Sequence, residues 1–139
     1  MSQFAFSTSA VSWNQNGTHL RIYTSDGAKV TEKCWDGGWS AGGFVQEGQA
    51  VGATSWQDGS GQIHIRAYVA NQGKVTEYCW DRDHWYVGAF PATPGSAVSA
   101  TAWQDGALHL RVYVTQPNGR VAELCWDGNG PWYPGAYQG

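Results

Sequence analysis

One pattern recurs three times along the 139 residues and limits the folds that are open to the chain. The tripeptide Cys-Trp-Asp begins at Cys34, Cys79 and Cys125, at spacings of 45 and 46 residues. Each copy also carries the pattern His-x-Arg-x-Tyr upstream and a glutamate two residues before the cysteine. So many identities in register indicate tandem copies of one structural unit. We expect a single domain of three repeats, at about residues 8–45, 51–91 and 97–138.

Each unit has the pattern of a small antiparallel sheet. Residues 19–23 and 29–35 are short runs rich in β-forming side chains, and turn dipeptides such as Asn16-Gly17 and Asp26-Gly27 flank them. The first copy therefore predicts four strands, centred near residues 10–14, 19–24, 29–35 and 39–44. No segment carries the 3.6-residue apolar stripe of an amphipathic helix. The predicted fold class is all-β.

A four-stranded unit of about 45 residues has the size of one blade of a β-propeller. Three blades cannot close a ring, because propellers have about 4–8 blades. Two architectures remain open. Two chains of three four-stranded blades could assemble into one six-bladed β-propeller, or one chain could fold alone as a β-trefoil monomer. Length and period do not separate the two.

The composition excludes several classes of partner. Eight Lys and Arg stand against 11 Asp and Glu, a net charge of −3, and no basic stripe suggests a nucleic-acid partner. No apolar run reaches the roughly 20 residues of a membrane helix, so we expect no membrane insertion. The N-terminal residues 1–6 lack the charged and apolar regions of a signal peptide, which leaves a cytoplasmic and a released protein both open. Because the number of cysteines is odd, at least one thiol is free or pairs between chains.

The alternation of side chains along the strands predicts a cleft between neighbouring repeats. Successive side chains of a strand point to opposite faces of the sheet. In the second copy Arg66 lies on one face, whereas Ile63 and Ile65 lie on the other. On the later strand, Glu77 and Trp80 likewise point to opposite faces. If the repeats stack face to face, each cleft has one charged wall and one wall of aromatic and aliphatic side chains.

A cleft of this kind suits a sugar. An arginine offers N–H donors in a planar fork and a glutamate offers acceptor oxygens, so the two together can bind adjacent hydroxyl groups. A tryptophan face packs against an apolar C–H surface, and its indole N–H adds a donor. Because a sugar ring has both kinds of surface, the pattern indicates a carbohydrate ligand without naming the sugar.

The motif order resembles that of a known family. Arg-x-Tyr, then Thr-Glu-x-Cys-Trp-Asp-Gly, then Trp and Gly-Ala-Phe/Tyr are similar to the fucose-specific lectin family of the Aleuria aurantia type, and to its small repeat members such as the Ralstonia solanacearum lectin. The resemblance covers all three repeats, roughly residues 9–137. It implies a six-bladed β-propeller that binds L-fucose and fucosylated glycans multivalently between adjacent blades. Three repeats per chain then imply a homodimer.

The resemblance also implies which residues bind the sugar. One blade contributes Arg, Glu and a backbone N–H near the Gly-Ala pair, and the next contributes two Trp and aliphatic side chains. The first cleft would use Arg21, Glu32 and Gly43 with Ile63, Ile65, Trp80 and Trp85. The second would use Arg66, Glu77 and Ala89 with Leu108, Leu110, Trp126 and Trp132. The third would use Arg111, Glu123 and Ala136, with Leu20, Trp35 and Trp39 of the partner subunit.

The three copies depart from one another at a few of these positions. Gly43 stands where the other copies have Ala89 and Ala136, and Thr18 stands where they have Ile63 and Leu108. We therefore expect clefts of unequal affinity, with the second nearest to the family pattern.

Other interpretations of the same residues are also open. The repeated Arg and Glu could form a structural ion pair, and an arginine beside each glutamate should keep the glutamate ionised. No motif places Trp13, Trp56 or Trp103 at a cleft, so we expect these three in the core. The Asp after each Cys-Trp is most simply a turn residue, and the cysteines are expected as small buried hydrophobes.

Two other functions compete with a lectin. A propeller could serve as a structural scaffold for protein partners, with no sugar activity. A glycoside hydrolase is disfavoured, because it needs two carboxylates across the scissile bond and each cleft has one. The sequence calls for no cofactor or metal, since it has neither the short ligand spacing of a zinc site nor the acidic oxygen cluster of a calcium site.

Overall fold

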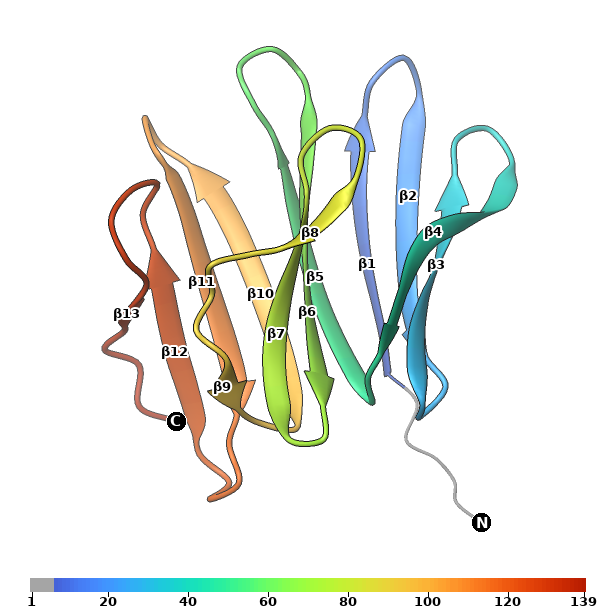
Figure 1. Ribbon diagram of the computed structural model, residues 1–139. Coiled ribbons are helices and arrows are strands. Elements are labelled where there is room, and N and C mark those ends of the chain that lie inside the picture. The colour runs from blue at the N-terminus through green and yellow to red at the C-terminus, as the bar shows by residue number, and fades with distance from the viewer. Residues whose placement is uncertain (1–6) are drawn as a thin grey trace.

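The computed structural model describes residues 7–139, which form three antiparallel sheets that stand side by side (Figure 1). The first sheet holds strands β1 (Ser7–Asn14), β2 (Thr18–Ser25), β3 (Lys29–Trp35) and β4 (Trp39–Glu47). The second holds β5 (Ala50–Gln57), β6 (Ile63–Asn71), β7 (Lys74–Trp80) and β8 (Trp85–Val87), with β9 (Thr93–Pro94) also paired to β7. The third holds β10 (Ala97–Gln104), β11 (Leu108–Thr115), β12 (Val121–Trp126) and β13 (Tyr133–Pro134).

The described residues contain no helix, so none of them forms a helix that is long and apolar enough to cross a membrane. The first six residues, on which the signal-peptide expectation rests, lie outside the described part of the chain.

The strands of the first repeat lie where the sequence places them, within three residues at each end. The fourth strands of the other two repeats are much shorter than β4. Pro91 follows soon after β8, and Pro134 ends β13. A proline lacks the N–H that a ladder needs, so it shortens an outer strand without disturbing the inner three.

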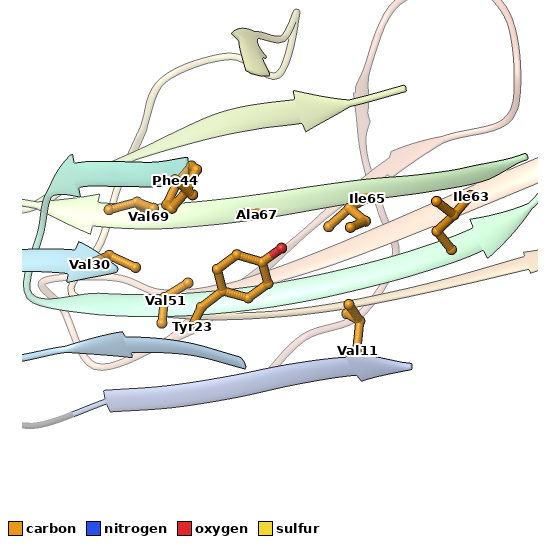
Figure 2. Packing of buried hydrophobic residues seen from close by; sticks show 9 residues of the cluster. All are labelled: Val11, Tyr23, Val30, Phe44, Val51, Ile63, Ile65, Ala67 and Val69. Carbon is orange, nitrogen blue, oxygen red and sulfur yellow. The ribbon is translucent and has the colours of Figure 1, made fainter. Parts of the chain in front are cut away.

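Apolar side chains fill the space between consecutive sheets. Figure 2 shows the cluster between the first and second sheets, in which side chains from β1 to β4 point toward those of β5 and β6. Its members are Val11, Tyr23, Val30, Phe44, Val51, Ile63, Ile65, Ala67 and Val69. A second cluster packs the second sheet on the third in the same way, around Tyr68, Phe90 and Val112.

The first strands of the three sheets approach one another closely. Ser7 and Ser9 of β1 accept hydrogen bonds through Oγ from the backbone amides of Val51 and Ala53 of β5, at 3.0 and 2.9 Å. On its other side, β5 approaches β10 so closely that a Cβ on Gly52 would lie 2.3 Å from the carbonyl oxygen of Val98. Each repeat therefore closes its own sheet and packs face to face on the next, as the blades of a propeller do. The β-trefoil alternative is wrong.

Candidate functional site

A cleft of about 230 Å³ lies between the first and second sheets. It is smaller than the roughly 300–1,000 Å³ of sites for drug-sized ligands, and its size suits a single small ring. The structure brings together all seven residues expected for the first cleft, and adds Trp13, Cys34 and Gly42 to its lining. The first sheet supplies Arg21 and Glu32 on one wall, and the second sheet supplies the aromatic wall opposite.

A matching cleft of about 220 Å³ lies between the second and third sheets. Six of the seven expected residues line it: Arg66, Glu77, Ala89, Leu110, Trp126 and Trp132. Leu108 does not line this cleft, although its counterpart Ile63 lines the first. Tyr86, Cys79 and Gly88 line it in addition.

The residues expected for the third cleft lie on opposite outer faces of the chain. Arg111, Glu123 and Ala136 belong to the third sheet, and Leu20, Trp35 and Trp39 to the first. Trp39 is 57% exposed and borders an open groove with Ile22, Lys33, Ser40 and Ala41. One chain alone therefore presents two separate halves of such a cleft.

The aromatic walls are built by pairs of tryptophans, one at the end of the third strand of a sheet and one at or just before the start of the fourth. Trp80 and Trp85 have ring centroids 5.7 Å apart, and Trp126 and Trp132 have theirs 6.4 Å apart. Phe44 of the preceding sheet packs against Trp85 at 4.6 Å. The core cluster thus supports one edge of the aromatic wall.

The cleft glutamates are held by tyrosine hydroxyls. Tyr23 donates to Glu32 at 2.8 Å, and Tyr68 and Tyr113 donate to Glu77 and Glu123 at 2.7 Å. Burial and the neighbouring carboxylate raise the pKa of Tyr23 far above its usual value, so this hydroxyl keeps its proton and remains a donor. For Glu123, the hydrogen bond from Tyr113 lowers the pKa of the carboxyl group, and the amide of Tyr137 adds to the effect.

The other oxygen of each glutamate accepts from a backbone amide. The donors are the amides of Phe44, Phe90 and Tyr137, at 3.4, 3.2 and 3.0 Å. Each amide lies one residue beyond Gly43, Ala89 or Ala136. For Glu123 the charge of Arg111 also lowers the pKa of the carboxyl group, in the direction expected of an adjacent arginine, but the hydrogen bonds from Tyr113 and from the amide of Tyr137 have the larger effect.

A glycine makes room for each of these carboxylates. A Cβ on Gly42 would lie 2.0 Å from Oε1 of Glu32, and Gly88 and Gly135 stand in the same relation to Glu77 and Glu123. Real Cβ atoms do not approach another atom this closely. The glycine before Gly43, Ala89 and Ala136 is therefore required by the neighbouring glutamate side chain.

The cleft arginines pair with aspartates. Arg66 donates from Nη1 to Asp81 at 2.8 Å, and Arg21 and Arg111 donate to Asp36 and Asp127 at 2.9 Å. Within residues 7–139, no ion pair joins a cleft arginine to a cleft glutamate. The structural Arg–Glu ion pair was therefore wrong, and so was the assignment of these aspartates to a turn role alone.

The first tryptophan of each repeat covers the arginine. The guanidinium carbons of Arg21, Arg66 and Arg111 lie 4.8, 4.8 and 5.0 Å from the ring centres of Trp13, Trp56 and Trp103. This geometry is that of a cation–π contact. Trp13 packs against the core cluster as expected, but it also lines the first cleft, and Trp103 is 39% exposed. The expectation of three core tryptophans was wrong for Trp103 and incomplete for Trp13.

A histidine stacks on the same tryptophan and contacts the same aspartate oxygen as the arginine. His19 and Trp13 have ring centroids 5.1 Å apart, and His19 Nδ1 lies 2.6 Å from Asp36. Its Nε2 lies 2.8 Å from the carbonyl oxygen of Gln15, so both ring nitrogens face acceptors. The hydrogen bond to Asp36 raises the pKa of His19, and the bond to Asp127 raises that of His109. These histidines help to hold the arginine's partner and do not line the clefts.

The sequence contained a signal for these supporting residues. Asp36, Asp81 and Asp127 recur at a fixed place after Cys-Trp, as the histidines recur two residues before the arginine. Hairpin pairing places Trp13 opposite His19 and Trp56 opposite His64. Recurrence of all these residues together, in every copy, indicates one network around the arginine.

A further groove in the structure lacks the side chains that characterise the two clefts. A larger groove of about 620 Å³ runs between the same two sheets at the end where Lys29 and Lys74 lie. It has no Arg and Trp pair, and its lysines are exposed. Among the described residues, no group of three or more His, Cys, Asp or Glu side chains could hold a metal ion.

The aspartate network predicts a specific dependence of stability on pH. Burial of Asp81 opposes its ionisation, but hydrogen bonds from Arg66, Tyr86 and His64 outweigh burial and hold its pKa at about 2. An aspartate in an unfolded chain has a pKa of about 3.9. The stabilisation of the fold by the ionised Asp81 is therefore complete above a pH of about 4, and it is lost as the pH falls from about 4 toward 2.

Urea unfolding between pH 2 and 6 tests this expectation. Asp81→Asn should be less stable than the parent at pH 6 and should lose less stability on acidification. Asp83→Asn, which changes an exposed carboxylate beside His84, is the charge-matched control. Parallel acid profiles for the parent and Asp81→Asn would contradict the assignment.

The chain matches a family model and several solved structures. The fungal fucose-specific lectin model matches residues 3–92 and 74–138. A fucose lectin from Kordia zhangzhouensis, in complex with methyl-fucoside, is 44% identical with a TM-score of 0.83, and the match covers 94% of this chain and 99% of that one. Among curated proteins, no relative matches the chain.

Two longer lectins match over about half of their length. The SapL1 lectin, in complex with alpha methyl fucoside, is 31% identical with a TM-score of 0.83, and the match covers 97% of this chain and 49% of that one. A variant of the Aleuria aurantia lectin, in complex with alpha-methyl-L-fucoside, is 28% identical with a TM-score of 0.71, and the match covers 94% and 44%. These similarities confirm the expected propeller-type, all-β fold.

The family model covers nearly the whole chain, and the family consists of lectins, which bind carbohydrate and are not enzymes. The chain belongs to the fungal fucose-specific lectin family.

Proposed function

We propose that this protein is a lectin that binds L-fucose and fucosylated glycans in the clefts between successive sheets. The observation that carries the proposal is the pairing, in both complete clefts, of an arginine and a glutamate with a facing wall of two tryptophans and an aliphatic side chain. The fork of N–H donors and the carboxylate can bind adjacent ring hydroxyls, while the aromatic wall packs on the C–H face of the sugar. The complexes of similar lectins with methyl fucosides support this choice of sugar.

The residues that we propose to contact the sugar are those already placed in the clefts, together with the third set. Arg111, Glu123 and Ala136 of one chain would meet Leu20, Trp35 and Trp39 of the partner subunit. A homodimer would bury the exposed face around Trp39 and close the ring of six blades, since the third sheet would then pack as the first two do. The dimer thus accounts for an exposed aromatic face and an incomplete cleft at once.

Multivalency follows from this assembly. A single monosaccharide buries little surface, so the affinity of each cleft should be modest. Three clefts per chain would give six in the dimer. Simultaneous engagement of several clefts on a glycan-coated surface would raise the apparent affinity by roughly 10²–10⁴.

Native mass spectrometry with and without excess L-fucose tests the proposal. We expect a species of twice 15.1 kDa that takes up to six sugars. A monomer that takes two sugars would contradict the dimer and leave sugar binding in place. A dimer that takes none would contradict the lectin function and favour a scaffold for protein partners, and D-glucose under the same conditions controls for nonspecific adducts.

A further inference from the structure

Each cleft contains two opposite charges that nevertheless do not pair with each other. Arg66 and Glu77 lie on the same face of the second sheet and line the same cleft. Opposite charges so near each other in a partly buried site attract strongly, and a direct pair would occupy the groups that a ligand needs. Tyr68 and the amide of Phe90 already occupy the oxygens of Glu77, and a separate partner holds the arginine away from the glutamate.

The aspartate outside the cleft lining does this. Nη1 of Arg66 donates both to Asp81 and to the carbonyl oxygen of Ile65, at 2.8 and 3.0 Å, and Nη2 makes a longer contact of 3.4 Å with the second oxygen of Asp81. Arg21 and Arg111 use Nη1 in the same two ways. An arginine has five N–H donors, so the Nε side of the fork stays available to the cleft.

The three aspartates are not equally supported. Asp81 accepts from Arg66, His64 and Tyr86, and Asp127 accepts from Arg111, His109 and Tyr133. Among the described residues, Asp36 accepts side-chain hydrogen bonds only from Arg21 and His19.

The missing donor in the first sheet has a clear origin. Ser40, Tyr86 and Tyr133 occupy equivalent places, because each pairs with the cysteine of the adjacent strand. Only Ser40 is too short to reach the aspartate. The Asp36 side chain is 43% exposed, compared with 30% for Asp81 and 33% for Asp127.

We propose that Asp36, Asp81 and Asp127 are positioning residues that hold each cleft arginine apart from the cleft glutamate, and that the tyrosine hydroxyl present in the second and third sheets makes the second cleft tighter than the first. The affinity part rests on the proposed function, whereas the positioning of the arginine does not.

The positioning is tested without any sugar. The Nε–Hε signal of Arg66, assigned with Arg66→Lys, should report an ordered side chain by ¹⁵N relaxation in the parent. Asp81→Ala should make this group markedly more mobile, and Asp81→Asn, which retains an acceptor oxygen, should lie between the two. Asp83→Ala is the matched control in the same turn, because among the described residues the Asp83 side chain has the exposed His84 as its only ion-pair partner. An Arg66 signal that is equally ordered in Asp81→Ala would overturn the proposal.

The expected difference in affinity between the first and second clefts is tested by adding the missing tyrosine hydroxyl to the first sheet. The double variant Arg66→Ala/Arg111→Ala serves as the background, because it keeps only the arginine of the first cleft. In it, Ser40→Tyr should tighten methyl α-L-fucoside binding about 3- to 10-fold by calorimetry, whereas Ser40→Phe, which lacks the hydroxyl, should not. Conversely, Tyr86→Phe in the background Arg21→Ala/Arg111→Ala should weaken the second cleft by a similar factor.

The outcomes separate the two proposals. Equal affinities for Ser40→Tyr and Ser40→Phe, with the parent still binding, would overturn the ordering of the clefts. If the parent itself binds no fucoside, the proposed function fails together with the ordering, and the relaxation measurement alone decides the positioning role. A mere loss of folding would lower the midpoint of thermal unfolding, but it could not produce the gain expected for Ser40→Tyr.

Discussion

Arg66→Ala should weaken fucoside binding at the second cleft by about 2–3 kcal/mol, or roughly 30- to 150-fold. The substitution removes the charge-assisted donors of that cleft and leaves the first cleft untouched, since Arg21 belongs to another sheet. Calorimetry should therefore show the loss of one sugar per chain at concentrations that saturate the parent.

Arg82→Ala provides the control for this prediction. Arg82 is an exposed arginine of the same repeat, and it makes no ion pair among the described residues. Its replacement should leave both the stoichiometry and the affinity unchanged. An unaltered stoichiometry in Arg66→Ala would show that this arginine does not bind the sugar.

Gly42→Ala and Gly43→Ala should differ sharply in stability although the two positions are adjacent. A Cβ on Gly42 would lie 2.0 Å from Oε1 of Glu32, whereas a Cβ on Gly43 would meet no atom within 4 Å. Glu32 is 6% exposed and Tyr23 is fully buried, so a displaced carboxylate would leave a buried hydroxyl without its acceptor. We expect Gly42→Ala to lower the free energy of unfolding by about 2–4 kcal/mol, from the steric overlap and the lost hydrogen bond together.

Gly43→Ala, in contrast, should change the free energy of unfolding by less than about 0.5 kcal/mol, as a surface substitution does. Alanine already occupies the equivalent positions Ala89 and Ala136. Urea unfolding of the two variants, followed by tryptophan fluorescence, makes the comparison. Equal stabilities would mean that the glutamate can move aside at little cost.

The existence of one charged and one aromatic wall in each cleft could be predicted from the sequence because it depends on two periodicities. The repeat of about 45 residues fixes which residues are equivalent, and the two-residue alternation of a strand fixes which face each takes. Arg66 and Glu77 therefore had to share a face, and Trp80 had to point to the other. The residues of the first cleft were named from the family resemblance, and the structure brings them together, while their role in binding sugar stays a prediction.

The supporting network could not be predicted in the same way. That Asp81 accepts from Arg66, His64 and Tyr86 depends on hairpin register and on side-chain rotamers, which a periodic pattern does not contain. The sequence predicts Trp13 in the core, because no motif places it at a cleft. Its ring in fact packs on the core with one part and lies under Arg21 with another.

Leu108 shows that residues at equivalent positions in two repeats do not always line equivalent clefts. Its counterpart Ile63 lines the first cleft, but Leu108 does not line the second. The prediction for the third cleft stays untested for another reason. Its two halves lie on opposite faces of one chain, so a single chain does not bring them together.

The cysteines beneath the clefts determine how the protein responds to oxidants. All three thiols are buried and free, with exposures of 9% for Cys34, 2% for Cys79 and 3% for Cys125. Burial raises the pKa of the Cys79 thiol to about 12, so at neutral pH almost none of it is the reactive thiolate. The described fold contains no disulfide, because all three cysteines are free. At neutral pH the Cys79 thiol should therefore resist iodoacetamide until the chain unfolds.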